Sequence, residues 1–280
     1  MDLDVNSREK EKEGNNKMLA NYHTHTTRCN HATGTDREYV EEAIKAGMKV
    51  LGFSDHCPWD FPDPDYVAGL RMTPAQMDDY FDSILSLRKE YEKDITIYVG
   101  FEAEYLPPLM ERQEKLYADY PVDYLILGQH NFGYDKGIVG WAGDPNVGDS
   151  ELLTYINLCI EGMKSGKYKY LCHPDLLNYP YKDEHNEELY YKEYKRLLEY
   201  MKEADYPIEL NMNGLVGGRH YPCDRFFRIA QEVGNKVIIG CDAHYPELLS
   251  NKDAAEHALE YVSRYDLGIV NYLPGLGPKN

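Results

Sequence analysis

The sequence predicts an α/β fold in which parallel strands form a barrel-like arrangement. Short apolar segments of strand length alternate about seven times with longer charged segments that have the pattern of amphipathic helices. Polar residues able to bind metals follow nearly every apolar segment. A barrel collects single side chains from the carboxyl ends of many strands, whereas a doubly wound sheet concentrates them at one point. The even distribution therefore favours the barrel over the open sheet.

Seven apolar segments are expected to be the strands, and the first of them is short and weak. They are residues 18–22, 50–54, 95–101, 124–127, 168–172, 208–210 and 236–240. Helix-like segments separate them, so the strands should run mostly parallel with helices covering them. The sequence contains no internal repeat and no Gly/Ser linker that would divide this series.

Five segments between these strands are expected to be helices. Residues 37–47 place Val40, Ala43 and Ile44 on one face and end in glycine. Thr73 followed by Pro74 is typical of a helix start, here for a helix that reaches residue 93. The remaining three are residues 151–166, 185–204 and 222–234.

Composition limits the classes of partner. The chain has 280 residues and a formal net charge of −18, which argues against nucleic acid or an anionic membrane as the main partner. No apolar run approaches the ~20 residues that span a bilayer. Residues 1–17 have only Met1, Leu3 and Val5 as large apolar residues, so we expect a disordered tail followed by one domain over residues 18–280.

The compartment is expected to be the cytoplasm. The N-terminal segment has no apolar h-region of the kind found in secretory signals. Six cysteines are scattered without a C-x-x-C pair, which is typical of reduced thiols that pack as small buried hydrophobic residues.

Histidines and carboxylates accumulate at the expected strand ends. Seven of the ten histidines lie there, namely His23, His25, His31, His56, His130, His173 and His244, together with Asp55, Glu102, Glu104, Asp175 and Asp242. Imidazole nitrogen with carboxylate oxygen suits Zn²⁺, Fe²⁺ or Mn²⁺. Seven imidazoles exceed the needs of one ion, so two or three ions are expected. Such a cluster can hold a bridging hydroxide and clamp the oxygens of a displacement at phosphorus.

Other function classes stay open at this point. The sequence has no G-x-S-x-G motif of serine hydrolases and no glycine-rich nucleotide loop. A non-catalytic metal-binding protein would bind the same ions without turnover. A metal-dependent amide hydrolase on a similar barrel would call for a carboxylated lysine, and no lysine stands at a strand-end motif.

Residues 22–62, YHTHTTRCNHATGTDREYVEEAIKAGMKVLGFSDHCPWDFP, closely resemble the opening of the polymerase-and-histidinol-phosphatase (PHP) superfamily. Within it, they resemble the monofunctional histidinol-phosphate phosphatases. The later motifs GFEAEY, GQHNF, CHPD, ELN and GCDAH follow in the family's order, so the resemblance spans residues 18–245. Gln129 is a departure, because many members have a small residue there, and we expect it to alter hydrogen bonding rather than the number of ions.

The resemblance implies a distorted seven-stranded (β/α)7 TIM-like barrel with three divalent metal ions of uncertain identity, zinc, iron or manganese. The first ion would take His23, His25, Glu102 and Asp242. Glu102 would bridge to a second ion bound by His130 and His173, and the third ion would take His31, His56 and His244.

The activity that the resemblance implies is hydrolysis of L-histidinol phosphate to L-histidinol and phosphate, with Asp242, Glu102 and His220 as catalytic residues. The alternative is another small phosphomonoester, such as a nucleotide, a sugar phosphate or phosphotyrosine. Arg219 and His220 are expected to contact substrate, because a guanidinium fork suits phosphate oxygens and His220 could protonate the leaving alkoxide.

Other polar residues near the motifs have expected supporting roles. Asp55, Asp175 and Asn211 are expected to orient imidazoles. Glu104 is either an ordinary barrel residue or a contact to the substrate amine. Trp59 and Phe61 either wall the substrate's imidazole or anchor their loop. The expected partner is a small phosphomonoester, with no nucleic acid and no membrane, and the sequence does not predict an oligomeric state.

Overall fold

The structure is a computed structural model that describes residues 17–66 and 68–279. All but the last residue of the expected N-terminal tail therefore lies outside the described residues. Four parallel strands form one sheet in the order β1 (Ala20–Asn21), β2 (Val50–His56), β3 (Thr96–Ala103) and β4 (Tyr124–Leu127). A second parallel group has the order β7 (Ile208–Asn211), β8 (Lys236–Gly240) and β9 (Gly268–Ile269). Six of the seven predicted strands are confirmed with small shifts in their ends.

The predicted strand at residues 168–172 is not a regular strand, because only Leu171 forms bridges, one to Leu127 and one to Ile208. Its backbone is nevertheless bonded on both sides. The Cys172 amide donates to the Leu127 carbonyl at 2.9 Å, and the Glu209 amide donates to the Leu171 carbonyl at 3.1 Å. The segment therefore connects β4 to β7, and with it the two strand groups.

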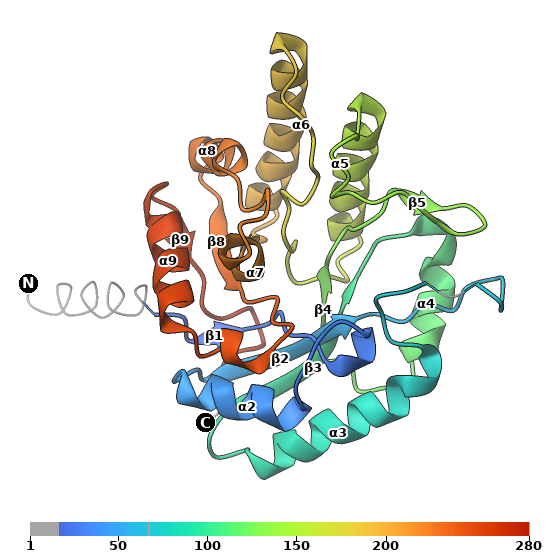
Figure 1. The fold of residues 1–280 in the computed structure, drawn as a ribbon, viewed down its shortest axis with the longest axis vertical. Helices are drawn as coiled ribbons and strands as arrows, with labels where there is room; N and C mark the ends of the chain where they lie inside the picture. The colour runs from blue at the N-terminus through green and yellow to red at the C-terminus, as the bar shows by residue number, and fades with distance from the viewer. Residues whose placement is uncertain (1–16, 67, 280) are drawn as a thin grey trace, which may run out of the picture.

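The opposite edges of the two groups also meet. The amide of His25, beyond β1, donates to the carbonyl of Ala243, beyond β8, at 3.0 Å, and the Ala243 amide donates to the His23 carbonyl at 3.2 Å. The parallel sheet is thus strongly curled, and its strands present their carboxyl ends around one opening with helices on the outside (Figure 1).

All five predicted helices are confirmed. They are α2 (Asp36–Lys45), α3 (Met77–Glu90), α5 (Asp149–Lys164), α6 (Glu184–Glu203) and α8 (Asp224–Val233). The start of α2 is a capping box, in which the Thr35 side chain accepts from the Glu38 amide and the Glu38 carboxylate accepts from the Thr35 amide. Thr73 and Pro74 begin a 3-10 turn, Pro74–Gln76, that leads into α3.

Several further elements were not predicted. They are α4 (Met110–Tyr117), α7 (Met212–Val216), α9 (Lys252–Ser263), strand β9, the hairpin of β5 (Gly133–Tyr134) and β6 (Ile138–Val139), and the short 3-10 turns Thr27–Cys29, Pro107–Leu109 and Pro246–Leu248. No helix among the described residues is long and apolar enough to cross a membrane.

Tyrosines fill much of the space enclosed by the strands. Tyr22, Tyr98, Tyr124 and Tyr170 pack together in one buried cluster. The Tyr124 hydroxyl donates to the Tyr22 carbonyl at 2.9 Å, so its polar end is satisfied inside the core. A Cβ at Gly52 would lie 2.2 Å from that hydroxyl, so only glycine leaves room for the ring. This packed layer supports the strand ends from below and holds the site residues above it.

Candidate metal centre

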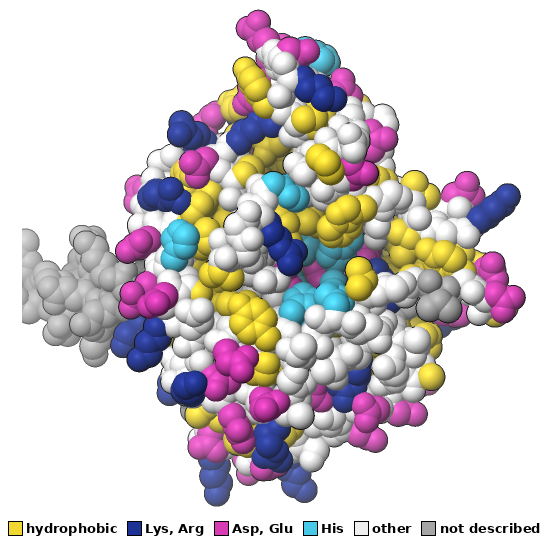
Figure 2. All heavy atoms as spheres, in the orientation of Figure 1, with side chains coloured by type: hydrophobic (Ala, Val, Ile, Leu, Met, Phe, Trp, Pro, Cys, Tyr) yellow, Lys and Arg dark blue, Asp and Glu magenta, His cyan; other side chains and the backbone are white. Residues whose placement is uncertain are grey.

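A cavity of about 710 Å³ opens at the carboxyl ends of the strands. Figure 2 shows it as a hollow in the face of the molecule, with histidine side chains gathered on its floor. Seven of the nine predicted metal ligands line it, namely His31, His56, Glu102, His130, His173, Asp242 and His244. The other two, His23 and His25, lie beneath this floor with no exposed surface. The structure therefore brings all nine residues to one place.

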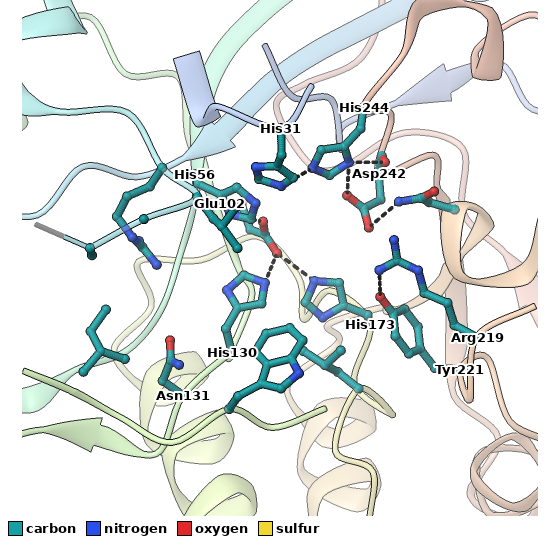
Figure 3. A pocket seen from close by; sticks show the side chains of 18 of the residues that line it. His31, His56, Glu102, His130, Asn131, His173, Arg219, Tyr221, Asp242 and His244 are labelled. Carbon is teal, nitrogen blue, oxygen red and sulfur yellow. Dashed lines mark hydrogen bonds and ion pairs between the residues drawn. The ribbon is translucent and has the colours of Figure 1, made fainter. Parts of the chain in front are cut away.

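Glu102, near the end of β3, is the centre of the cluster. Its Oε2 lies 3.6 Å from His23 Nε2, 3.7 Å from His25 Nε2 and 2.9 Å from His56 Nδ1. Its Oε1 lies 2.7 Å from His173 Nε2 and 3.1 Å from His130 Nε2 (Figure 3). Each carboxylate oxygen thus faces a different set of imidazoles, which is the arrangement of a bridging ligand.

We call His23, His25, Glu102 and Asp242 the deep group. Asp242 Oδ1 lies 3.0 Å from His25 Nε2 and 3.6 Å from His23 Nε2. The far nitrogen of each ring faces a buried carboxylate: His23 Nδ1 is 2.8 Å from Glu209, and His25 Nδ1 is 3.4 Å from Asp55. These partners hold each ring with Nε2 turned toward the centre.

His130 and His173 form a second group on the other side of Glu102. His130 Nδ1 lies 3.0 Å from Glu104, which fixes that ring as Asp55 and Glu209 fix the deep rings. His173 has a backbone φ of 25°, a region that residues with a side chain rarely adopt. Backbone strain of this kind is found at functional sites that the surrounding structure holds in place.

The rim group consists of His31, His56 and His244. His31 Nε2 and His244 Nε2 face each other at 2.8 Å. The other ring nitrogens of these two residues lie against backbone carbonyls, at Cys29 and Asp242. Nitrogens of His25, His56 and His244 also lie within 4.8 Å of one another, as required for shared ligation of one ion.

The donor set fits divalent metal ions. Four buried side-chain atoms of the cluster have no hydrogen-bond partner among the described residues: His23 Nε2, His25 Nε2, Glu102 Oε2 and His173 Nδ1. Leaving such groups buried and unpaired is costly, and an ion in the centre of the cluster would satisfy His23 Nε2, His25 Nε2 and Glu102 Oε2. Cys29 lies close enough to His31 and His244 to join them in a second possible donor set.

The electrostatics differ between the deep and rim groups. Burial alone would lower the pKa of His25, but the carboxylates of Asp242 and Asp55 outweigh it and raise that pKa to about 9. Burial lowers the pKa of His56 to about 4 and that of His244 to about 3, and the nearby His25 adds to both shifts. The histidines around Glu102 and Asp242 overcome burial and hold the pKa of both carboxyls well below the usual range.

The predicted substrate residues are placed differently from each other. Arg219 lines the cavity, and its guanidinium donates to the Tyr221 hydroxyl at 2.9 Å (Figure 3). The His220 ring nitrogen Nε2 donates to the Leu176 carbonyl at 2.7 Å, and His220 is not among the residues that line the cavity. Its predicted contact with substrate and its role as a proton donor therefore stay predictions.

The three residues predicted to orient imidazoles have different kinds of partner in the structure. Asp55 faces His25 and also accepts from the Thr26 hydroxyl. Asn211 donates to Asp242 Oδ2 at 3.1 Å, so it holds a carboxylate and not an imidazole. Asp175 contacts no imidazole and accepts from the Cys223 amide at 2.7 Å, and burial raises its pKa to about 7. Gln129 bonds to backbone on both sides of His130, at Tyr105 and Asn131.

Three residues of the site were not predicted. Glu209 stands two positions before Asn211 on β7, and that spacing puts both on one face of the strand, so alternation could have found it. Arg71 ion-pairs with Glu104 at 2.7 Å from a segment without periodicity. Trp141 lines the cavity with 48% of its surface exposed, and its plane lies 16° from that of the His130 ring. Only its position eleven residues beyond His130 could have suggested it, which is a weak signal.

Two bacterial proteins named as phosphatases are similar to this chain over most of its length. A protein of Deinococcus radiodurans named "probable histidinol-phosphatase" is 29% identical over 238 residues, which cover 81% of this chain and 87% of that protein. A protein of Aliivibrio fischeri named "probable phosphatase" is 26% identical over 247 residues, covering 87% of this chain and 85% of that protein.

A solved structure has the same fold. Histidinol phosphate phosphatase from Lactococcus lactis, crystallised with zinc, L-histidinol and phosphate, superposes with a TM-score of 0.65 at 17% identity over 90% of this chain and 95% of that one. The model of the PHP domain matches residues 21–213, more than two thirds of the sequence. The chain therefore belongs to the PHP domain family.

Proposed function

We propose that this protein hydrolyses L-histidinol phosphate to L-histidinol and phosphate at a site that binds three divalent metal ions. The observation that carries the proposal is the cluster of seven imidazoles with the carboxylates of Glu102 and Asp242, under a cavity that also exposes Arg219. The relatives indicate a hydrolase of the phosphatase class. The bound zinc, L-histidinol and phosphate of the Lactococcus protein support the choice of substrate.

We infer that the scaffold is one domain over residues 18–280, a distorted barrel of seven strands. The backbone bonds of residues 168–172 to both neighbours support counting that segment as the fifth strand. The pairing of Thr24 with Ala243 supports closure between the first and the last strand of the ring.

The proposed ligands follow the three groups of the site. The deep group would hold the first ion, Glu102 with His130 and His173 the second, and the rim group the third. Zn²⁺, Fe²⁺ and Mn²⁺ all suit these donors. Ions bound there supply an activated water as the nucleophile and neutralise charge on the phosphate, as in other metal-dependent phosphatases.

The residues of the chain bind and orient the substrate. Arg219 presents a guanidinium fork to the phosphate oxygens, and its bond to the Tyr221 hydroxyl limits its rotation. Trp141 offers a flat apolar surface in the same cavity, which suits a planar ring such as the imidazole of histidinol. Asn211 holds one oxygen of Asp242, which leaves the other facing His23 and His25.

A second candidate is a phosphatase that acts on another small phosphomonoester. The same metal groups and Arg219 would serve any such ester, because metal ions and a guanidinium recognise the phosphate that all these esters share. The half-exposed Trp141 favours a leaving group with a ring, so a nucleotide or a phosphotyrosine fits this alternative better than a sugar phosphate does.

The test is phosphate release from L-histidinol phosphate, p-nitrophenyl phosphate and AMP, with the metal content of the same sample. A kcat/KM for histidinol phosphate about a hundredfold above the others supports the proposed substrate. Equal rates on all three would retain the phosphatase and reject histidinol phosphate. Bound metal without turnover on any ester would identify a non-catalytic metal protein.

A further inference from the structure

Arg71 contacts a carboxylate that in turn contacts a predicted metal ligand. It lies on the segment between β2 and α3, and its side chain is only 9% exposed. Its Nη2 donates to Glu104 Oε1 at 2.7 Å, and its Nη1 donates to Glu104 Oε2 at 3.1 Å and to the Cys57 carbonyl at 3.0 Å. The guanidinium therefore donates to both carboxylate oxygens of Glu104 and also to the backbone of the loop that follows β2.

The Glu104 carboxylate is buried and has three side chains as hydrogen-bond partners. Besides Arg71, it accepts from Trp59 Nε1 at 3.1 Å and faces His130 Nδ1 at 3.0 Å. A carboxylate only accepts, so Nδ1 carries a proton toward Glu104, and in the neutral ring this leaves the lone pair of Nε2, 3.1 Å from Glu102, for an ion bound between them. The tautomer and the direction of His130 are thus set by the position of Glu104.

The carboxylates that orient the deep rings have no such cation. Glu209 faces His23 and accepts from Asn211 at 2.8 Å, and Asp55 faces His25 and accepts from Thr26. Among the described residues, Arg71 makes the sole ion pair between an arginine or lysine and a carboxylate that orients one of the predicted ligands. Among the described residues, His130 is therefore the one predicted ligand whose orienting carboxylate is itself paired with an arginine.

We propose that Arg71 is a positioning residue that acts through Glu104 to hold His130 in the geometry needed to bind an ion. This inference rests on the proposed metal binding of the site and does not depend on the substrate. Without Arg71, Glu104 loses two of its four hydrogen bonds and its ion pair with the guanidinium. It can then rotate and release His130 Nδ1, and the ring is free to turn its Nε2 away from Glu102.

The test is the metal affinity of the Arg71→Met variant, measured by competition with a chelator on intact protein. The expected result is a 10- to 100-fold weaker affinity for one ion and unchanged affinity for the others, since loss of such an orienting partner typically has this effect. Arg71→Lys keeps the charge but not the fork, and an intermediate loss is expected. Histidine ¹⁵N spectra should show that His130 no longer carries its proton only on Nδ1.

The matched control is Arg88→Met, because Arg88 also pairs with a partly buried carboxylate, Asp123, but does not line the cavity. It should keep every ion at the affinity of the unmodified protein. The double variant Arg71→Met, Glu104→Gln should bind the ion no more weakly than Glu104→Gln alone, because the two residues act in series.

Two results would overturn the inference. One is a folded Arg71→Met or Arg71→Lys protein that binds all ions as the unmodified protein does. The other is an equal loss of all ions in Arg71→Met and Arg88→Met, which would indicate a general loss of stability. An unmodified protein that binds no divalent ion would reject the proposed metal site itself, and that outcome is distinct from both.

Discussion

The deep and rim groups contain the same kind of ligand but are supported in different ways. The far ring nitrogens of His23 and His25 face buried carboxylates, whereas that of His31 faces the backbone carbonyl of Cys29. His244 is intermediate, because its Nδ1 lies 3.0 Å from the Asp242 carbonyl and 3.3 Å from the Asp242 carboxylate. A carboxylate partner raises the basicity of a ligating imidazole more than a neutral carbonyl does. His31 is also exposed, while both deep histidines are fully buried. We therefore expect the deep group to bind an ion more tightly than the rim group does.

The largest expected effect is that of removing a deep ligand. His23→Ala should lower kcat/KM by more than about a hundredfold even with excess metal, because it removes charge stabilisation from the centre of the site. His31→Ala should remove one ion and lower activity less. Phosphate release and metal content per chain check both variants. His257→Ala, an exposed histidine far along the chain, is the control, and equal losses in His23→Ala and His31→Ala would contradict the comparison.

The next largest effect is expected from Glu209, which contacts the His23 ring but is not itself a predicted metal ligand. Glu209→Gln should weaken the deep ion about 10- to 100-fold, because the amide cannot accept from His23 Nδ1 as strongly as the carboxylate does. Chelator competition measures the change. The rim ion should keep its affinity, since Glu209 contacts no rim residue in the described part of the chain. A selective loss of the rim ion in Glu209→Gln would contradict the assignment of Glu209 as a support of the deep group.

The Arg219→Ala variant tests substrate binding separately from metal binding. Arg219→Ala should lower kcat/KM about ten- to a hundredfold, corresponding to about 1.5–3 kcal/mol for hydrogen bonds to a charged group. Both groups should keep their ions, because Arg219 contacts Tyr221 and no predicted ligand. Arg219→Lys should recover part of the loss. If Arg219→Ala instead loses metal, the residue supports the site and does not bind phosphate.

The smallest effect is in the protons released on metal binding. In ion-free protein His25 has a pKa of about 9, so it carries a proton at neutral pH that an entering ion must displace. His56 and His244 have pKa values of about 4 and 3, so they are already neutral. Affinity of the deep group should therefore rise with pH up to about 9, while loss of protons from His56 and His244 should add no pH dependence to the rim group near neutral pH. Calorimetry in buffers of different ionisation enthalpy would detect this, and proton release at the rim alone would contradict it.

The raised pKa of His25 also affects the stability of the ion-free fold. A pKa above the unfolded value of 6.5 stabilises the folded state fully below pH 6.5, and this contribution is lost as the pH rises through about 9. Bound metal replaces the proton. The melting temperature of stripped protein should therefore fall between pH 6.5 and 9, whereas that of metal-loaded protein should change less.

The fold was largely predictable because its elements follow local rules. The strands of residues 124–127 and 236–240 were predicted to the residue, since an apolar run bounded by polar motifs marks both ends. Residues 168–172 were harder, because their pairing depends on neighbours that are distant in the sequence and makes bridges only at Leu171. Short elements such as α7 were missed because five residues are too few to show a helical period.

The site was predictable where residues able to bind metals stand at the ends of apolar strands. His23, Glu102 and Asp242 all follow apolar strands, so alternation and residue type were sufficient to place them together. Arg71 and Trp141 lie on irregular segments, where sequence spacing does not determine which way a side chain points. His220 stays a prediction, since its ring nitrogen bonds to the backbone carbonyl of Leu176 and its position alone does not test a role in the reaction.

The most direct test of the central claim is to strip the protein with a chelator and follow phosphate release from L-histidinol phosphate as Zn²⁺ or Mn²⁺ is added back. The predicted result is no turnover without ions and a return of activity as the ions bind, with kcat/KM about a hundredfold above that for p-nitrophenyl phosphate and AMP. Turnover that survives complete removal of metal would contradict a metal-dependent phosphatase. Restored activity of equal size on all three esters would contradict L-histidinol phosphate as the substrate.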